Sequence, residues 1–388
     1  MPSEHFEQPL RDWSARKHAI LKAYLPTFCT VLSNRAGGPI WYVDGYAGAG
    51  VYQNKNNPSP GEPGSPVLAA QTARDLPYDV RCINVEEDDE NFESLERETM
   101  PFSHVTNIHA DFNNVVDNVL NTVARHPALF FLDPFGTKDL PMEGLVDRIA
   151  MRTRQMDILL RYATETVRRV AAAYEKDLSR QVAYAQTLNK WFRGTEWQQL
   201  LQRFPVGPER DQALLNYYMQ QLVSISGGRL AYASSYPIRT IEGNVKYHLV
   251  FATGDRLGIK LMSDILYREE TRFIEQQAEH KQKKHDLKLQ GQMSLFEEPK
   301  PDPIALQQEQ LDQIQATILQ IAREGRTDWE FDGLRCELII NHGWFAHMSE
   351  KEFRAACKTL HTFGKIERLT LHNNAWGKGT HFRILPKS

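Results

Sequence analysis

The chain has 388 residues, of which 24% are charged, and this length and composition predict a globular protein of about two domains. Its 46 basic and 49 acidic side chains leave a formal net charge of −3, so a nucleic-acid role has to rest on local basic patches. No apolar run approaches the ~20 residues of a membrane span, and no signal segment opens the chain. We therefore expect a cytoplasmic protein with no membrane partner.

The four cysteines lie far apart and form no CxxC pair. This spacing argues against a zinc ribbon and a disulfide framework, and we expect no bound metal. It predicts reduced, mostly buried thiols at Cys29, Cys82, Cys336 and Cys357.

Helical and strand-like segments alternate over the first 165 residues. Predicted strands are a buried run that ends at the glycines after Asp44, and residues 80–85, 105–109, 128–132 and 157–162. Predicted helices cover residues 12–35, 67–74, 89–98, 112–124 and 140–151. The second helix has Ser65 as its expected N-cap and Pro66 as its first residue. Strands that alternate with helices in this way predict a parallel, doubly wound α/β sheet.

The rest of the chain predicts an extension of this domain and a second, smaller one. A helical insertion covers about 166–229, and residues 230–279 hold an antiparallel hairpin and a last helix. We expect an α/β domain over 1–279, with its cofactor half at 1–165, and a flexible linker over 280–308. Residues 309–388 show three helices followed by two strands, which is the order of a winged helix-turn-helix.

The loop after the first predicted strand is rich in glycine. It reads Val43-Asp44-Gly45-Tyr46-Ala47-Gly48-Ala49-Gly50. Glycines let a backbone pass close to a ligand, and an acid at a strand end can hold a cationic or hydroxyl-bearing group. A purely structural turn is the alternative, since glycine-rich turns between strands and helices are common.

Two further acids follow the next two predicted strands. Glu86 is placed to accept both hydroxyls of a ribose, and Asp111 is placed to accept from an exocyclic adenine amine. The alternatives are a helix N-terminal acid for Glu86 and an N-cap for Asp111. Three acids at successive strand ends suit an adenosyl ligand with a sulfonium and repel a diphosphate, and the loop lacks the lysine of a P-loop. The predicted cofactor is therefore S-adenosylmethionine.

The fourth predicted strand ends in Asp133-Pro134-Phe135-Gly136, which resembles the Asp-Pro-Pro-aromatic signature of methyltransferases that act on planar amino groups. The Asp133 carboxylate and the Pro134 carbonyl can each accept an N–H of an exocyclic amine, and Phe135 can stack on the base. Such positioning would aim the nitrogen lone pair at a sulfonium methyl group. A simple turn is the alternative, and Gly136 departs from the signature.

These segments together resemble the three-Cys-motif partner proteins, TcmP, over residues 11–270. The resemblance is carried by Trp13 with Lys17, Tyr24-Leu25, YVDGYAGAGVY, the GEPGSP loop, NVEEDDENFESL, FFLDPFGTKDLPM and YHLVFATGDRLGIKLMSDIL. It implies a Rossmann-like class I methyltransferase fold and a three-Cys-motif partner similar to radical-SAM enzymes, but no defined substrate. The C-terminal part resembles the winged-helix domain often appended to this family. The DPFG segment also resembles the motif of tRNA guanine-N2 methyltransferases.

Two groups of basic residues are candidates for nucleic-acid binding. One follows the fifth strand and the other lies on the recognition helix and wing, because arginine and lysine can bind phosphates there. They are Arg161, Arg168, Arg169, Lys351, Arg354, Lys358, Lys378 and Arg383. The alternatives are a solvated helix face and a winged helix that binds protein.

The sequence therefore predicts an S-adenosylmethionine-dependent N-methyltransferase acting on an exocyclic amine of a nucleic-acid base, working with a three-Cys-motif partner. The alternative is a catalytically silent cofactor-binding or scaffold protein that binds DNA or a protein through its winged helix. Within the predicted linker, residues Gln292–Phe296 resemble the sliding-clamp binding pentapeptide, and docking within the chain is the alternative for them.

Overall fold

A computed structural model describes residues 11–33, 37–52, 61–134, 140–152, 155–288, 303–370 and 376–385. The chain divides into two compact units, with the boundary between Ile259 and Lys260. Among the described residues, no helix is both long and apolar enough to cross a membrane. The four cysteines are buried and free, as predicted.

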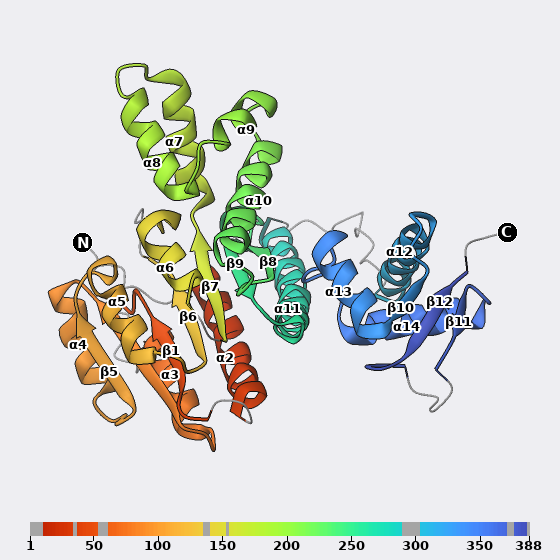
Figure 1. Cartoon of the computed structure of the whole chain (residues 1–388), viewed down its shortest axis with the longest axis horizontal. Coiled ribbons are helices and arrows are strands. Elements are labelled where there is room, and N and C mark those ends of the chain that lie inside the picture. The colour runs from red at the N-terminus through yellow and green to blue at the C-terminus, as the bar shows by residue number, and fades with distance from the viewer. Residues whose placement is uncertain are drawn as a thin grey trace. The chain divides into compact units, whose positions relative to one another are not determined.

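The first unit is built on a seven-stranded sheet in the order β5-β4-β1-β6-β7-β9-β8 (Figure 1). Neighbouring strands are parallel except β9, which pairs antiparallel with both β7 and β8. The strands are β1 (Ile40–Asp44), β4 (Val80–Glu86), β5 (Val105–His109), β6 (Ala128–Leu132), β7 (Met156–Tyr162), β8 (Tyr232–Arg239) and β9 (Val245–Thr253). The five predicted parallel strands and the antiparallel hairpin are therefore confirmed.

This strand order creates a switch point in the sheet. From β1 the chain proceeds outward through β4 to β5, then returns to the other side of β1 with β6 and β7. Open α/β sheets bind ligands beyond the carboxyl ends of their strands at such a point. Together with the antiparallel β9 between β7 and β8, the order defines the class I methyltransferase type of sheet, as the sequence predicts.

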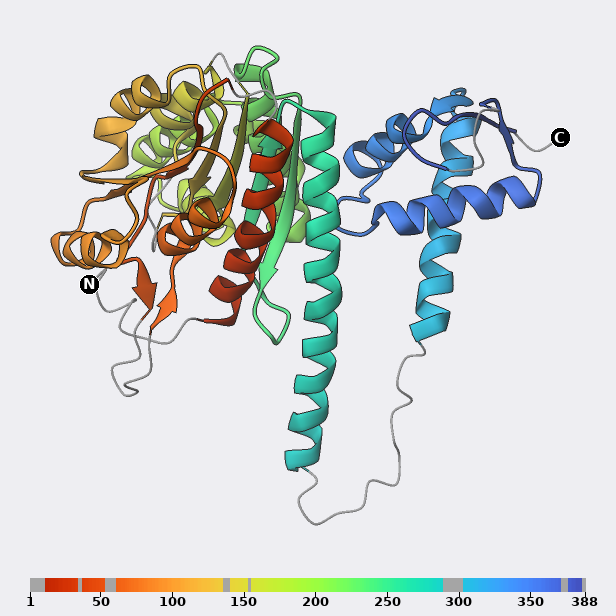
Figure 2. The ribbon, with the colours of Figure 1, turned by 90° about the horizontal axis from the view of Figure 1, so that it is seen from below.

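Helices cover both faces of the sheet. They are α2 (Asp12–Ser33), α3 (Ser65–Asp75), α4 (Asp89–Thr99), α5 (Phe112–Val123), α6 (Asp147–Ala150), α7 (Thr164–Lys176), α8 (Gln181–Phe192), α9 (Trp197–Arg203) and α10 (Pro208–Ile225). In Figure 2, α2 and α3 (red and orange) lie on one side of the sheet, where they pack on β1. The other face is covered by α5 and α10, and the predicted helical insertion is the group from α7 to α10.

Burial explains why the central strands are continuous apolar runs. Every residue of β1 and β6 is buried, which is expected for parallel strands covered on both faces. Side chains alternate between the two faces. Val43 and Phe130 belong to the core under α5, while Asp44 and Phe131 therefore point to the opposite face, toward α2 and α3.

Two local predictions in this unit are wrong. The helix expected over 140–151 is a π-turn, η1 (Met142–Val146), followed by the short α6, because Gly144 has φ +85° and interrupts the helical path. The N-cap of α3 is Gly64 rather than Ser65, and it makes no side-chain cap bond. The Ser65 hydroxyl is hydrogen-bonded to Asp44 instead, and the adjacent strands β2 (Val51–Tyr52) and β3 (Glu62–Pro63) form a small sheet of their own.

The second unit combines helices with a three-stranded antiparallel sheet in the order β10-β12-β11. Its elements are α11 (Arg256–Lys288, from Lys260 on), α12 (Pro303–Arg323), β10 (Asp328–Glu330), α13 (Phe331–Asn341), α14 (Glu350–Thr362), β11 (Ile366–Arg368) and β12 (His381–Ile384). This element order is compatible with the predicted winged helix-turn-helix. The predicted N-cap Ser349 is confirmed and forms a capping box with Glu352.

The linker and domain boundaries predicted from composition differ from the structure. Helix α11 continues through Lys288 and α12 begins at Pro303, so both helices occupy parts of the predicted linker 280–308. The charged run that suggested a tether is instead the exposed continuation of a helix. The pentapeptide Gln292–Phe296 lies outside the described residues.

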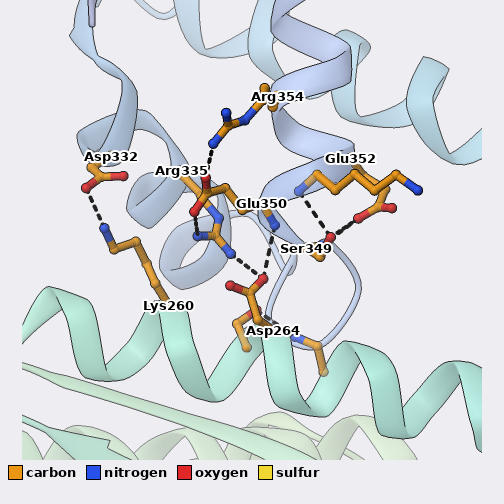
Figure 3. Close-up of polar contacts among 11 residues, drawn as sticks. Lys260, Asp264, Asp332, Arg335, Ser349, Glu350, Glu352 and Arg354 are labelled. Carbon is orange, nitrogen blue, oxygen red and sulfur yellow. Dashed lines mark hydrogen bonds and ion pairs between the residues drawn. The ribbon is translucent and has the colours of Figure 1, made fainter. Parts of the chain in front are cut away.

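Buried ion pairs join α11 to α13 and α14 within the second unit (Figure 3). Arg335 of α13 is 1% exposed and binds Asp264 of α11 and Glu350 of α14. Lys260 of α11 is paired with Asp332 at 2.6 Å. Because removing one partner leaves a buried charge without compensation, these contacts make the first turns of α11 part of the fold of this unit.

Asp157, at the start of β7, is a buried acid on the α2 face of the sheet. The Tyr24 hydroxyl of α2 donates to it at 2.5 Å, and Thr253 supplies a second side-chain hydrogen bond. Burial raises the pKa of Asp157 to about 6 despite these donors. The folded chain therefore binds this proton more tightly than the unfolded chain.

This difference predicts a pH-dependent stability effect. Since the folded pKa is raised, the stability contributed by Asp157 falls as the pH rises from about 4 to about 6. Asp157→Asn keeps an acceptor for Tyr24 but has no group that titrates. We expect the difference in free energy of unfolding, variant minus wild type, to rise by about 1–3 kcal/mol from pH 4 to pH 7, measured by urea unfolding. Asp75→Asn on the exposed end of α3 is the matched control, and a pH-independent difference for Asp157→Asn would contradict the assignment.

Candidate functional site

The predicted site acids meet at the carboxyl edge of the sheet. Asp44 ends β1, Glu86 ends β4, and Asp133 directly follows β6. Parallel strands place their carboxyl ends at one edge, and β1 lies between β4 and β6. The structure therefore brings the three predicted residues together beside the switch point.

Asp44 lies beneath the glycine loop and has no exposed surface. Its carboxylate accepts from the Tyr42 hydroxyl at 3.0 Å, the Tyr46 amide at 3.2 Å and the Ser65 side chain. Burial raises its pKa to about 6, although these donors oppose the shift. Asp44 thus holds the loop in shape through the Tyr46 amide, and its contact with the cofactor stays a prediction.

The loop itself needs its glycines. Gly48 and Gly50 have φ values of +66° and +79°, a region that favours glycine. A Cβ on Gly45 would lie 2.9 Å from side-chain atoms of both Leu132 and Phe112. The predicted tight turn after the first strand is confirmed, and the close approach of its backbone to a ligand stays a prediction.

Glu86 braces the same loop from the neighbouring strand. Its Oε2 accepts from the Gly48 amide at 2.7 Å and its Oε1 from the Asp88 amide at 2.9 Å. Burial raises the pKa of Glu86, and these two amides together with the nearby Asn91 side chain oppose the shift. A carboxylate has about four acceptor positions, so Glu86 retains capacity for a ribose hydroxyl.

Asp111 is the N-cap of α5, the alternative considered for it. Its Oδ1 accepts from the amide and the side chain of Asn113, at 2.9 and 3.0 Å. Its Oδ2 has no hydrogen-bond partner among the described residues. The side chain is half-buried and raises the pKa of the nearby Tyr46, together with burial of that tyrosine. Asp111 can therefore cap the helix with one oxygen and accept from a ligand amine with the other.

Asp133 forms an ion pair with Lys17 of α2, and both side chains are almost fully buried. Burial acts to raise the pKa of Asp133, but the charges of Lys17 and Arg161 outweigh it and hold the pKa below its usual value. The adjacent His18 is 5% exposed, and burial lowers its pKa to about 3, so its ring is neutral at pH 7. The acid after β6 is therefore ionised and surrounded by cationic donors.

The Asp133 carboxylate and the Pro134 carbonyl, the two acceptors predicted for a substrate amine, form what we call the amine clamp. Its second acceptor, the Pro134 carbonyl, is also hydrogen-bonded within the chain. The Pro134 carbonyl accepts from Arg161 Nη1 at 2.6 Å, and the Arg161 guanidinium lies 4.9 Å from the centre of the Tyr247 ring. With Lys17 on Asp133, both groups assigned to a substrate amine are bound to cations of the chain itself. The amine clamp therefore stays a prediction, and Asp133 Oδ1 is the one oxygen of its two groups that has no hydrogen-bond partner among the described residues. Phe135, its third member, lies outside the described residues.

Most of the predicted nucleic-acid arginines are bound to groups of the chain itself, whereas Arg169 and the lysines form no ion pair within the described ranges. Arg161 points into the site, Arg168 is paired with Asp211, and only Arg169 of that group is exposed and has no partner among the described residues. In the second unit Arg354 is paired with Glu350 and Arg383 with Asp328. The remaining predicted residues, Lys351, Lys358 and Lys378, are exposed and form no ion pair within the described ranges.

No protein-family model and no curated protein match the chain, so the three-Cys-motif partner resemblance stays a prediction. Solved structures do match it. A Legionella pneumophila protein is 13% identical, over 63% of this chain and 86% of its own, with a TM-score of 0.38. An O-methyltransferase from Bacillus cereus in complex with SAH is 10% identical, over 59% and 80%, with a TM-score of 0.30.

A third match is TYW2 of M. jannaschii in complex with AdoMet. It is 14% identical, over 62% of this chain and 75% of its own, with a TM-score of 0.30. Likeness at these identities and TM-scores carries no argument about substrate or chemistry. The site residues have to be interpreted from their own geometry.

The packing around Gly45 predicts a stability loss on substitution. In Gly45→Ala the new methyl group would collide with the buried Leu132 and Phe112 side chains, and we expect a loss of about 1–3 kcal/mol in the free energy of unfolding. Gly333→Ala is the matched control, because its nearest atom would be 3.8 Å away, and its effect should stay within about 0.5 kcal/mol. Equal effects of the two changes in urea unfolding would refute the packing argument.

Proposed function

We propose that the chain is an S-adenosylmethionine-dependent methyltransferase that acts on nucleic acid. The observation that carries the proposal is the convergence of the glycine loop with Glu86, Asp111 and Asp133 at the switch point of a class I sheet. The cofactor supplies a methyl group on a cationic sulfur. Carboxylates suit such a ligand, because they attract its positive charge and accept from its amine and hydroxyl groups.

The residues divide the binding task among them. Glu86 would accept a ribose hydroxyl with the acceptor capacity left over from its two amide donors, and Asp111 Oδ2 would accept the adenine amine. The backbone at Gly48 and Gly50 would let the ligand lie close to the loop. Asp44 would act indirectly, by holding the loop in shape.

Nucleic acid is the proposed substrate because of the exposed lysines of the second unit. Lys351 and Lys358 lie on α14, and Lys378 precedes β12. In the predicted winged helix-turn-helix these elements would be the recognition helix and the wing. N-methylation of a base amine would require Asp133 and Pro134 to be released from Lys17 and Arg161. A three-Cys-motif partner and a sliding clamp bound through 292–296 rest on sequence resemblance alone.

One observation favours a second candidate function. Because Lys17 and Arg161 occupy the acceptors of the predicted clamp, the fold would also suit a protein that binds the cofactor without transferring its methyl group. Such a protein would act as a scaffold that binds DNA or a protein partner through the second unit. It would bind nucleic acid normally and would show no methyl transfer.

The cofactor assignment predicts two affinity losses with a matched control. We expect Glu86→Gln and Asp111→Ala each to weaken S-adenosylmethionine binding about tenfold or more, since each removes a charged acceptor. Asp117→Ala on the same helix should leave the affinity unchanged, because its side chain is 69% exposed and pairs with Arg148. Calorimetric titration measures all four proteins, and wild type that does not bind the cofactor would refute the proposal.

The nucleic-acid assignment predicts a change in salt dependence. Replacing Lys351, Lys358 and Lys378 by glutamine should reduce the slope of log affinity against log salt by about 1 for each lysine that contacts a phosphate. Arg383→Gln should have a smaller effect, because Asp328 already binds that guanidinium. Fluorescence anisotropy with labelled RNA and DNA over a salt series tests this, and an unchanged slope in the triple variant would count against the lysines.

A further inference from the structure

The cations at Asp133 decide which kind of atom the site can receive. A base amine offers N–H donors, and of the acceptors placed for it Lys17 binds one oxygen of Asp133 and Arg161 binds the Pro134 carbonyl. The site therefore presents positive donors where the sequence motif alone suggests acceptors. Positive donors are the complement of an oxygen atom that gains negative charge during a reaction.

The unused atoms around Asp133 fit a hydroxyl group. Its Oδ2 is bound to Lys17, while its Oδ1 has no hydrogen-bond partner among the described residues. Arg161 Nε is buried and has no hydrogen-bond partner within the same ranges. One acceptor and one donor thus remain, and a hydroxyl is a donor and an acceptor at once.

Burial strengthens the attraction between the positive donors, Lys17 and Arg161, and an oxygen that gains negative charge. The side chains of Lys17 and Asp133 are 5% and 9% exposed, so water screens them little. Lys17 also lies 5.7 Å from the centre of the Phe131 ring, and Arg161 is fixed between the Pro134 carbonyl and Tyr247. Charges held rigidly in a dry site are the arrangement that stabilises a developing alkoxide.

We propose that the methyl acceptor is a hydroxyl oxygen, and that Lys17, Asp133 and Arg161 form its binding site. The inference rests on the proposed function and deepens it. The hydroxyl that nucleic acids carry along their length is the ribose 2′-OH, which is present in RNA and missing from DNA. The substrate is therefore RNA, methylated on ribose oxygen rather than on a base amine.

In the transfer step, the hydroxyl oxygen forms a bond to the methyl carbon of S-adenosylmethionine. The bond between that carbon and sulfur breaks, and its electron pair stays on sulfur. The hydroxyl proton passes to Asp133 Oδ1 and then to solvent. Lys17 and Arg161 donate to the oxygen while it loses the proton.

The test uses the full chain, tritiated methyl donor, and unmodified transcripts of tRNA and rRNA, with DNA duplexes in parallel. Alkali cleaves RNA through the free 2′-OH, so a methylated ribose leaves a labelled dinucleotide, whereas a methylated base leaves a labelled mononucleotide. Label in dinucleotides is the expected result. Label in mononucleotides or DNA would overturn the inference, and so would an absence of transfer to RNA by protein that binds the cofactor.

Calorimetry with S-adenosylmethionine separates the proposed function from the proposed hydroxyl acceptor. Protein that does not bind the cofactor would refute the function, whereas protein that binds it but transfers no methyl group to RNA would refute the hydroxyl acceptor. For Lys17→Met we expect methyl transfer to fall about 100- to 1,000-fold, with cofactor affinity within about threefold of wild type. Lys22→Met, an exposed position on the same helix, is the control and should behave as wild type.

If Lys17→Met does not fold, Lys17→Arg retains the charge beside Asp133 and should fold and show a smaller loss of transfer. Asp133→Asn keeps an acceptor for Lys17 but removes the group that takes the hydroxyl proton. Methyl transfer should therefore fall about 100-fold or more, with cofactor affinity within about threefold of wild type. Wild-type transfer rates in Lys17→Met or Lys17→Arg would contradict the assigned site.

Discussion

A carboxylate buried at the end of a strand costs free energy unless donors reach it, and the carboxyl edge of this sheet obtains its donors from neighbouring segments. The loop amide of Gly48 reaches Glu86, and Lys17 of α2 reaches Asp133. Each contact joins a strand end to an element that is distant in sequence. The position of α2 on the sheet and the shape of the glycine loop therefore depend on the same acids that form the candidate site.

The kind of donor gives each acid a different chemistry. Asp44 is met by neutral groups, and burial raises its pKa to about 6. Asp133 is also buried, but the charges of Lys17 and Arg161 outweigh burial and lower its pKa. Asp133 is therefore ionised well below neutral pH, whereas Asp44 loses its proton only as the pH rises through about 6. Two acids at adjacent strand ends thus differ in protonation because their donors differ.

Local patterns in the sequence predict the strands, most helices, the glycine loop and the Ser349 cap, because each depends on neighbouring residues. They do not predict contacts over long separations. Lys17 lies 116 residues before Asp133, and no spacing rule links them. The alternation of side chains along β7 could have placed Arg161. Residues 157 and 161 lie on the same face of the strand, and Asp157 contacts α2. An arginine on that face lies toward the site rather than in a solvated patch.

Arginine and lysine have different uses in this chain, so a count of positive charge does not by itself show which side chains are available to a ligand. Arg335 bridges two acids in the second unit, and Arg161 joins a carbonyl to an aromatic ring in the first. A planar guanidinium with five donors suits such multiple contacts, whereas an ammonium is a strongly hydrated point charge on a flexible stem. Exposed lysines therefore keep their charge at the surface, while Lys17 is the exception, because burial beside Asp133 pairs its charge inside the fold.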